Sequence, residues 1–181
     1  MNELRIGVIE DSIKARAQLV ELLIETVADG GSVSFMHPLS SEDATAFWSR
    51  SLIAAAREER VIFGAWERDR LVATVTLLLD CPPNQPHRAE IAKMMTRVEA
   101  RGRGAATALM NAAEAEAVRR ERTLLVLDTA SDGGASRLYE RLGFTFAGEI
   151  PDYALKPHGE LTGTRIYWKR IGDSAVLETD L

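Results

Sequence analysis

Arg101-Gly102-Arg103-Gly104-Ala105-Ala106 lies between an apolar stretch, residues 91–96, and an alanine-rich stretch of helical composition. A glycine loop that opens a helix leaves backbone N–H groups free and directs them at one place, with the positive end of the helix dipole behind them. Such a place binds phosphate oxygens, and the two arginines add positive charge. The segment predicts a strand, a phosphate-binding loop and a helix in succession, and a ligand that carries a diphosphate.

This loop differs from two common nucleotide-binding loops. Thr107 stands where the third glycine of a dinucleotide fingerprint would fall, and no lysine stands where a P-loop needs one. We therefore expect backbone amides to hold the ligand without a metal. A plain tight turn is the structural alternative, and a nicotinamide-dependent oxidoreductase is the weakest functional one.

Bulk properties bound the remaining possibilities. The 181 residues carry a net charge of −5, with 46% hydrophobic and 27% charged residues, which predicts a globular chain with one domain over residues 1–172 and a tail over 173–181. The negative charge argues against nucleic acid as the main partner. A single cysteine, Cys81, excludes an internal disulfide, and neither a secretion signal nor a membrane span is evident. We expect a cytoplasmic protein, monomeric or homodimeric, with no membrane partner.

Periodicity and turn residues predict an α/β (α+β) fold. The expected order is β-α-α-β-β-β-α-β-α-β-β, which implies a mixed, mostly antiparallel central sheet with helices on both faces. The continuous apolar run 124–127 predicts a strand buried on both faces. The expected strands are 4–9, 61–66, 71–79, 88–96, 124–127, 144–150 and 164–169. The expected helices begin after a cap at Asp11 or Ser12, at residues 40–43, after Gly104 and after Gly134.

Two motifs resemble the GNAT superfamily of acyl-CoA-dependent N-acyltransferases. Arg101, Gly104 and Ala106 fill the fixed positions of its signature [Q/R]-x-x-G-x-[G/A], within residues 96–106. Residues 135–144 resemble its later motif A-x-x-L-Y-x-x-L-G-F. The chain departs from the family pattern at Asp132, where asparagine is frequent, and at Val98, where proline is frequent. The resemblance covers most of the chain and implies the GNAT-like fold and acetyl-CoA as co-substrate.

Other segments resemble the tabtoxin-resistance type of acetyltransferase within that superfamily, which acetylates the amine of an amino-acid-like β-lactam toxin. This resemblance implies that Gly30-Gly31 and the loop at 148–153 lie where the amine acceptor binds. The segments are 25–27, 30–36, 88–90, 127–129 and 148–153.

The superfamily resemblance also assigns roles to individual residues. It implies that Tyr139 is the general acid that protonates the departing thiolate, for which a tyrosine of pKa ~10 is suited. The alternative is a tyrosine that only packs a helix on the sheet. The residues it implies for acyl-CoA binding are Met95, Thr96 and Arg97 through their backbone, then Arg101, Gly102, Arg103, Gly104, Ala105 and Ala106, and more weakly Asp132.

Glu90 and Asp128 interrupt apolar surroundings on two predicted strands, and a carboxylate there is costly unless it is paired or used. Either could accept the proton of the amine through water. Strict alternation would place Glu90 on one face with Met94 and Thr96, with ~20 Å between Glu90 and the Thr96 end. The alternatives are a salt bridge of Glu90 with Arg88, and substrate ammonium binding by Asp128.

Aromatic residues at Phe35, Trp48 and Tyr153 are candidates for the wall of the acceptor pocket, with core packing as the alternative. The three histidines lack metal-ligand spacing, so we expect no metal. The sequence as a whole predicts an acetyl-CoA-dependent N-acetyltransferase for a small amine. A protein N-terminus or a polyamine as acceptor, or a non-catalytic acyl-CoA-binding module, are the open alternatives.

Overall fold

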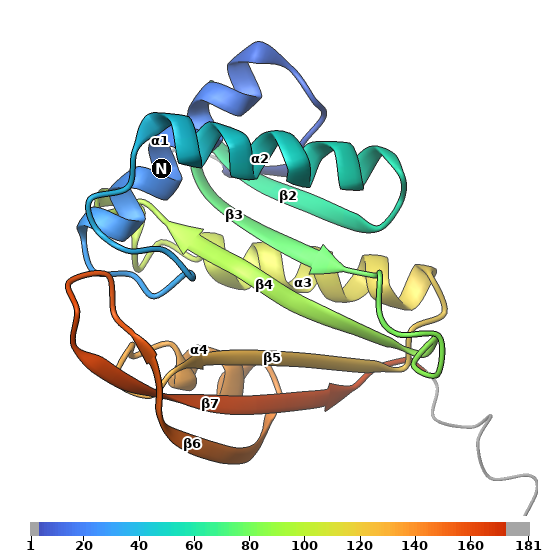
Figure 1. Ribbon diagram of the computed structural model, residues 1–181. Helices are drawn as coiled ribbons and strands as arrows, with labels where there is room; N and C mark the ends of the chain where they lie inside the picture. Colours follow the sequence, from blue (N-terminus) through green and yellow to red (C-terminus); the bar gives the residue numbers. More distant parts are fainter. Residues whose placement is uncertain (1–3, 173–181) are drawn as a thin grey trace, which may run out of the picture.

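The computed structural model describes residues 4–172, and the predicted tail 173–181 lies outside the described residues. The elements follow in the predicted order, and the predicted fold class is confirmed (Figure 1). They are β1 (Leu4–Val8), α1 (Ile13–Ala28), α2 (Ser41–Ala56), β2 (Arg60–Glu67), β3 (Arg70–Leu78), β4 (Arg88–Thr96), the 3-10 turn η1 (Val98–Ala100), α3 (Ala105–Arg119), β5 (Leu124–Ala130), α4 (Ser136–Arg141), β6 (Thr145–Leu155) and β7 (Leu161–Arg170).

Seven strands of the described chain form one sheet in the order β1-β2-β3-β4-β5-β7-β6. Neighbouring strands are antiparallel, apart from β4 and β5, which are parallel. The connection between those two strands is α3, as a parallel pair requires a crossover. The parallel pair therefore stands in the middle of the sheet, directly before and after the helix that the glycine loop opens.

The parallel pair is short, and this opens the sheet. β4 pairs with β5 only from Arg88–Leu124 to Glu90–Val126, although β4 continues to Thr96 and β5 to Ala130. Beyond this point the two strands diverge (Figure 1). Backbone groups on the facing edges of β4 and β5 are left without a ladder partner, and such groups need another partner when they are buried.

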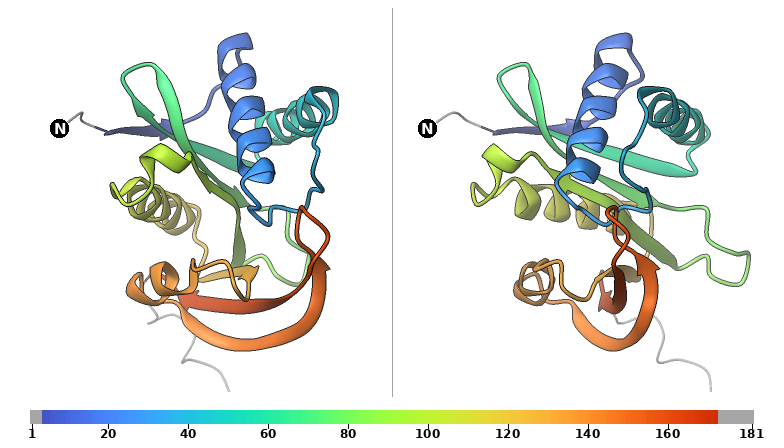
Figure 2. Two further views of the ribbon diagram at one scale, coloured as in Figure 1. Left: turned by 90° about the vertical axis from the view of Figure 1, so that its left-hand side faces the viewer. Right: turned by 60° about the vertical axis from the view of Figure 1, so that its left-hand side comes forward.

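Helices cover the two faces of the sheet in separate layers (Figure 2). Ser12 and Ser40 cap α1 and α2, each accepting a backbone N–H three residues on, at 3.1 and 3.0 Å. The apolar stripes of these helices form one core with Ile62, Leu71 and Met95. α3 and α4 pack on the opposite face, in a core that contains Leu109, Met110, Ala113, Leu125, Leu127 and Tyr139.

The prediction that residues 124–127 are buried on both faces is wrong. Leu125 and Leu127 are buried in the hydrophobic core between the sheet and α3. On the other face, Val126 is only partly buried and Asp128 is exposed. The reason is that α1 and α2 pack on β2, β3 and β4. The apolar run therefore predicts the strand correctly but not the open face that Asp128 occupies.

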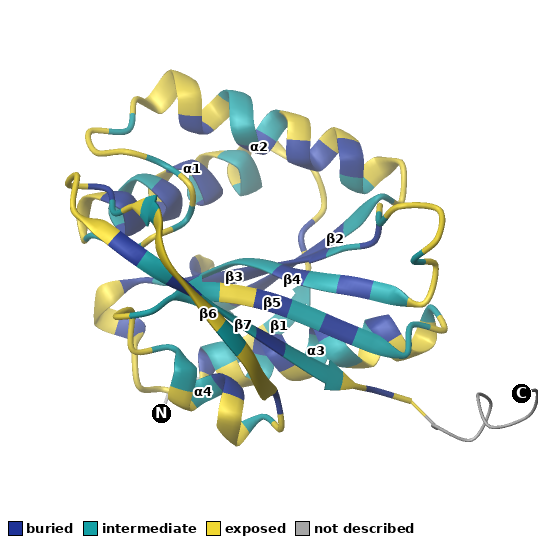
Figure 3. Cartoon of the chain, turned by 60° about the horizontal axis from the view of Figure 1, so that its bottom comes forward, coloured by how far each residue is buried: buried dark blue, intermediate teal, exposed yellow. Residues whose placement is uncertain are grey.

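The predicted strand 144–150 continues through the segment 148–153, also predicted to form a loop, and from Thr145 on both lie in β6, the edge strand (Figure 3), which is exposed along most of its length. The register of β6 with β7 shifts between Ile150 and Ala154, and Asp152 has a φ of +52°. Pro151 is tolerated because an edge strand can lose a backbone donor. The turn-forming residues of this segment thus produce a bulge within a strand.

Arg97 fixes the end of β4 to α1. Its guanidinium, 4% exposed, donates to Glu25 at 2.6 Å, to Glu21 at 3.3 Å and to the carbonyl of Leu71 at 2.8 Å. Glu25 also accepts the backbone N–H of Val98 at 3.2 Å. These bonds hold the strand end that leads into the glycine loop.

We expect Glu25→Ala to lower the free energy of unfolding by about 2 kcal/mol, less than for a fully buried pair because Glu21 remains as a partner. Chemical denaturation monitored by circular dichroism measures this loss. The matched control is Glu21→Ala, whose carboxylate is 67% exposed and which is expected to cost under ~1 kcal/mol. Equal losses in the two variants would contradict a special role for Glu25.

Candidate active site

The glycine loop has the geometry of an open anion cradle. Gly104 is the N-cap of α3 with a φ of +87°, and Gly102 has a φ of +76°, both in the region that favours glycine. A Cβ placed on either residue would meet no atom within 4 Å. Among the described residues, no hydrogen bond is formed by the backbone N–H groups of 103–107. The cradle fits the diphosphate of an acyl-CoA.

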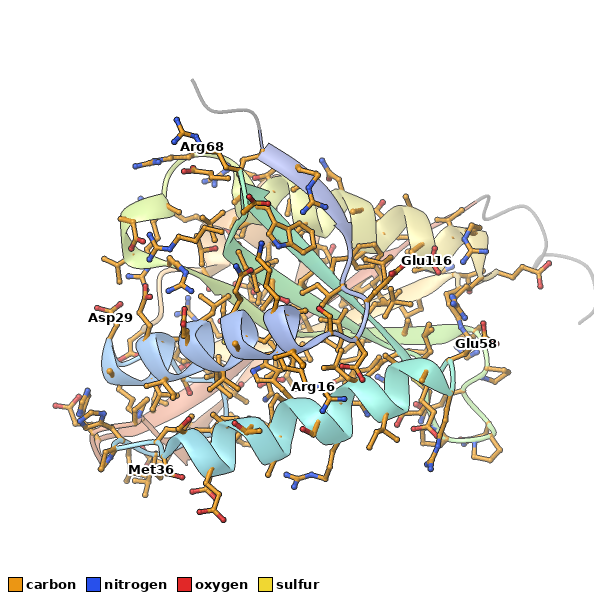
Figure 4. The ribbon with its side chains drawn as sticks, turned by 90° about the horizontal axis from the view of Figure 1, so that it is seen from above. Arg16, Asp29, Met36, Glu58, Arg68 and Glu116 are labelled. Carbon is orange, nitrogen blue, oxygen red and sulfur yellow. The ribbon has the colours of Figure 1, made fainter. Side chains whose placement is uncertain are left out.

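The two arginines of the loop are engaged in exposed ion pairs. Arg101 lies 2.6 Å from the carboxylate of Asp29, and Arg103 lies 3.2 Å from that of Glu67. Asp29 is at the C-terminal end of α1, at the same end of the molecule as Met36 and opposite Glu58 and Glu116 (Figure 4). Exposed pairs contribute little, so either arginine can turn to a phosphate at small cost.

Three residues at the end of β4 are implied for pantetheine binding, and within residues 4–172 one of them has a backbone N–H without a partner on β3. The N–H of Arg97 is bonded to the carbonyl of Val72, and Met95 is buried in the core. Because successive N–H groups of a strand point to opposite edges, that of Thr96 faces the open edge beside β5. The carbonyl of Thr96 accepts Nε of Arg101 at 3.4 Å. Thr96 is thus the residue of the three whose backbone is best placed.

A bulge in β4 overturns the predicted alternation. Val75 of β3 faces two residues of β4, Lys93 and Met94, and Lys93 has a φ of +51°. One extra residue reverses the sides of those that follow. Met95 therefore lies on the α1–α2 face with Glu90, and Met94 packs into the opposite core.

The two candidate carboxylates have different partners. Glu90 forms an ion pair with Arg88 at 3.1 Å, as the structural alternative anticipated. Asp128 is exposed and accepts the hydroxyl of Thr164 at 2.9 Å. Asp128 follows Val126 by two residues, on the part of β5 that diverges from β4.

Tyr139, on α4, is 5% exposed and lies in the hydrophobic core between the sheet and α3–α4. Its ring lies about 6 Å from those of Phe144 and Tyr167. Burial, and secondarily the charge of Asp128, raises the pKa of its hydroxyl to about 12. No protein group within the described chain forms a hydrogen bond with this hydroxyl. Tyr139 therefore holds its proton at neutral pH, close enough to Asp128 to sense its charge.

Lys93 is a residue that the sequence analysis missed. Its Nζ donates to the carbonyl of Val33 and to the hydroxyl of Ser34, both at 3.0 Å, and lies about 6 Å from the rings of Phe35 and Phe47. Burial lowers the pKa of this amine, while the charges of Asp128 and Glu90 act in the opposite direction. A lysine inside an apolar strand is the signal that could have found it.

The other predicted residues are dispersed. Phe35 packs edge-on against Phe47 near Lys93, whereas Trp48 is fully buried in the α1–α2 core, so core packing explains it. Tyr153 is 60% exposed on β6. Asp132 forms an ion pair with Lys156 and accepts the hydroxyl of Thr162 at 3.1 Å, so a cofactor contact would compete with these partners.

No cluster of three or more metal-ligating side chains occurs among the described residues. The rings of His37 and His158, distant in sequence, lie 4.7 Å apart, a pairing that spacing alone did not predict. Within the same residues, no helix combines the length and apolar character needed to cross a membrane. A surface hollow of about 610 Å³ lies beside the β2–β3 turn, and none of the candidate residues lines it.

Comparison with known proteins identifies the family. The sequence profile of the Acetyltransferase (GNAT) family matches residues 21–144. The chain belongs to this family. The match includes the glycine loop and the Tyr139 motif, so the superfamily resemblance read from those residues is confirmed, and with it an acyl-transfer chemistry.

Solved structures of GNAT proteins share the fold at low identity. A candidate acetyltransferase of Salmonella typhimurium with its cofactor acetyl-CoA has a TM-score of 0.76 and 16% identity, covering 98% of this chain and 99% of its own. A ribosomal-protein-alanine N-acetyltransferase of Brucella melitensis has a TM-score of 0.77 and 17% identity, covering 91% of this chain and 99% of its own. A candidate phosphinothricin N-acetyltransferase has a TM-score of 0.78 and 19% identity, covering 94% of this chain and 100% of its own. Proteins named for different acceptors thus resemble this chain to similar extents, and the fold does not select the acceptor.

Proposed function

We propose that this GNAT protein is an acetyl-CoA-dependent N-acetyltransferase that acts on the primary amine of a small amino-acid-like molecule by direct transfer in a ternary complex. The observation that carries the proposal is the arrangement around the divergence of β4 and β5. The glycine cradle lies at the start of α3, Asp128 lies on the part of β5 that diverges from β4, and the charge of Asp128 contributes to the raised pKa of Tyr139. A reaction that removes one proton and delivers another needs such a pair of groups.

The chain's own residues divide the work as follows. The free N–H groups of 103–107, with Arg101 and Arg103, hold the diphosphate, and Thr96 offers its backbone to the pantetheine arm. Bound acetyl-CoA supplies an activated acetyl thioester. The hydroxyl of Tyr139 carries the proton that the sulfur needs when the thiol leaves.

Asp128 is the better of the two candidate bases. It is exposed at the opening and its carboxylate has one hydroxyl partner, whereas the carboxylate of Glu90 is paired with Arg88. Attack requires a neutral amine, so Asp128 accepts the proton of the ammonium directly or through water. Glu90 adds negative charge beside the same opening.

For the acceptor, the resemblance of residues 30–36 and 148–153 to the tabtoxin-resistance type supports a small amino acid or a β-lactam toxin of that form. A protein N-terminus or a polyamine is the alternative within the family. A non-catalytic acyl-CoA-binding module is the alternative outside catalysis, and the joint presence of Asp128 and Tyr139 speaks against it.

The test is the release of free thiol from acetyl-CoA in the presence of single amines. The panel contains small amino acids, a tabtoxinine-type lactam, polyamines and short peptides. Release with a small amino acid or the lactam supports the proposal. Release only with peptides or polyamines would move the acceptor to that class, and no release despite tight acetyl-CoA binding would indicate a binding module.

We expect Gly104→Ala to raise the Kd of acetyl-CoA at least about tenfold, because the new methyl group enters the cradle and the positive φ strains an alanine by ~1–2 kcal/mol. Isothermal titration calorimetry measures the change. The control is Gly159→Ala in the β6–β7 turn, which also has a positive φ, +103°, and open surroundings. An unchanged Kd for Gly104→Ala would contradict binding of the acetyl-CoA diphosphate by the glycine loop.

A further inference from the structure

Lys93 is a partly buried cation for which the described part of the chain provides no ion pair. Among the described residues, no carboxylate lies within 4 Å of its Nζ, although Asp128 and Glu90 are near enough for their charges to act on it. Buried lysines without a charged partner are rare, because desolvating the ammonium is costly. The two hydrogen bonds to Val33 and Ser34 satisfy two of its three donors.

The backbone of Lys93 is strained in a way that directs its side chain. A φ of +51° inside a strand is unfavourable for a residue other than glycine, and it occurs at the bulge that reverses β4. Strain of this kind persists where the surrounding structure requires it and gathers at functional sites. Here the bulge brings Nζ to the α1–α2 connection, on the face of the sheet that Glu90 occupies.

The surroundings of this amine combine opposite charges and apolar rings. The rings of Phe35 and Phe47 lie about 6 Å from Nζ, and negative charge comes from Asp128 on β5 and from Glu90 on the same strand as Lys93. The ammonium of Lys93 does not contact the carboxylates of Asp128 and Glu90. This arrangement of opposite charges is complementary to a ligand that carries both an ammonium and a carboxylate. An α-amino acid is such a ligand, with its ammonium directed to Asp128 and its carboxylate to Lys93.

We propose that Lys93 determines acceptor specificity by binding the carboxylate of an α-amino-acid substrate through its third N–H. The inference rests on the proposed function and narrows its substrate class from small amines to zwitterionic amino acids. Lys93 acts as a specificity residue and takes no part in proton transfer. The alternative is that Lys93 only fastens the segment 33–34 to the sheet.

The experiment compares one amino acid that the wild type acetylates with its carboxamide, which keeps the amine and the shape but has no carboxylate. We expect Lys93→Met to raise KM for the amino acid by about 10- to 100-fold, the range of a charge-assisted hydrogen bond, and to leave KM for the carboxamide nearly unchanged. Lys93→Arg keeps the charge and is expected to recover part of the preference. Ser34→Ala removes a contact of Nζ with the connection and is the control for a fastening role.

Equal changes in KM for both acceptors, or a change in neither, would overturn the inference. Calorimetric binding of the same two compounds to the wild type and to Lys93→Met separates this result from a failure of the proposed function. A preference for the carboxylate that Lys93→Met abolishes supports the site even if no acetyl group is transferred. Binding without such a preference overturns it whatever the turnover.

Discussion

Replacing Tyr139 with phenylalanine is expected to lower kcat by about 10²- to 10⁴-fold, the usual contribution of a positioned general acid. The hydroxyl is the single group removed, and it has no hydrogen-bond partner within the described chain whose loss would disturb the fold. Steady-state kinetics at saturating acetyl-CoA measure the effect, and the Kd of acetyl-CoA is expected to stay within a few-fold of the wild type.

The control for this variant is Tyr167→Phe. Tyr167 is buried beside Tyr139, and its hydroxyl donates to Glu140 at 3.3 Å. We expect that variant to lose a little stability and to keep its rate. If both variants reduced kcat alike, the ring cluster and not the hydroxyl of Tyr139 would matter.

The raised pKa of Tyr139 also fixes the alkaline side of the pH profile. A group with a pKa of about 12 keeps its proton throughout the neutral and mildly alkaline range, so the wild-type rate is expected not to fall near pH ~10, where an ordinary tyrosine ionises. A fall at that pH that disappears in Tyr139→Phe would contradict the environment described here.

Asp128→Asn is expected to lower kcat/KM by about 10²- to 10⁴-fold, because the amide can neither accept the proton of the amine nor attract its ammonium. The amide keeps the size of the side chain and still accepts the hydroxyl of Thr164. Kinetics with an acceptor from the amine panel, measured across pH, provide the readout.

The matched variant is Glu90→Gln, for which the ion pair with Arg88 predicts a smaller loss. If Glu90→Gln lowers kcat/KM more than Asp128→Asn does, the base is Glu90 and not Asp128. If neither variant lowers kcat/KM, solvent deprotonates the amine, and neither carboxylate contributes to binding the acceptor or to its deprotonation.

Much of the fold could be predicted from local sequence. Ser12 and Ser40 are the N-caps of α1 and α2. The glycine loop immediately precedes α3, as predicted for a loop that leaves the first N–H groups of a helix free. The motif around Tyr139 predicted a short helix before Phe144, where the structure has α4. These features depend on neighbours in the chain, and so the sequence contains them.

The features that were missed depend on partners distant in sequence. The bulge at Lys93 arises from the pairing of β4 with β3, and strict alternation along β4 gave no sign of it. The open face of Asp128 depends on where α1 and α2 stop covering the sheet. The surroundings of Lys93, the ring of Phe35 and the charge of Asp128, come from segments distant in sequence, so the sequence around Lys93 does not predict them. A single sequence does not contain these contacts in its local pattern.

Following an isotopic label in the acetyl group shows whether this chain transfers that group from acetyl-CoA to the amine of a small amino acid. We expect labelled N-acetyl amino acid and free CoA thiol in equal amounts, and both nearly absent for Tyr139→Phe. Label that stays on acetyl-CoA in the presence of every small amino acid, or that moves only to peptides, would contradict it.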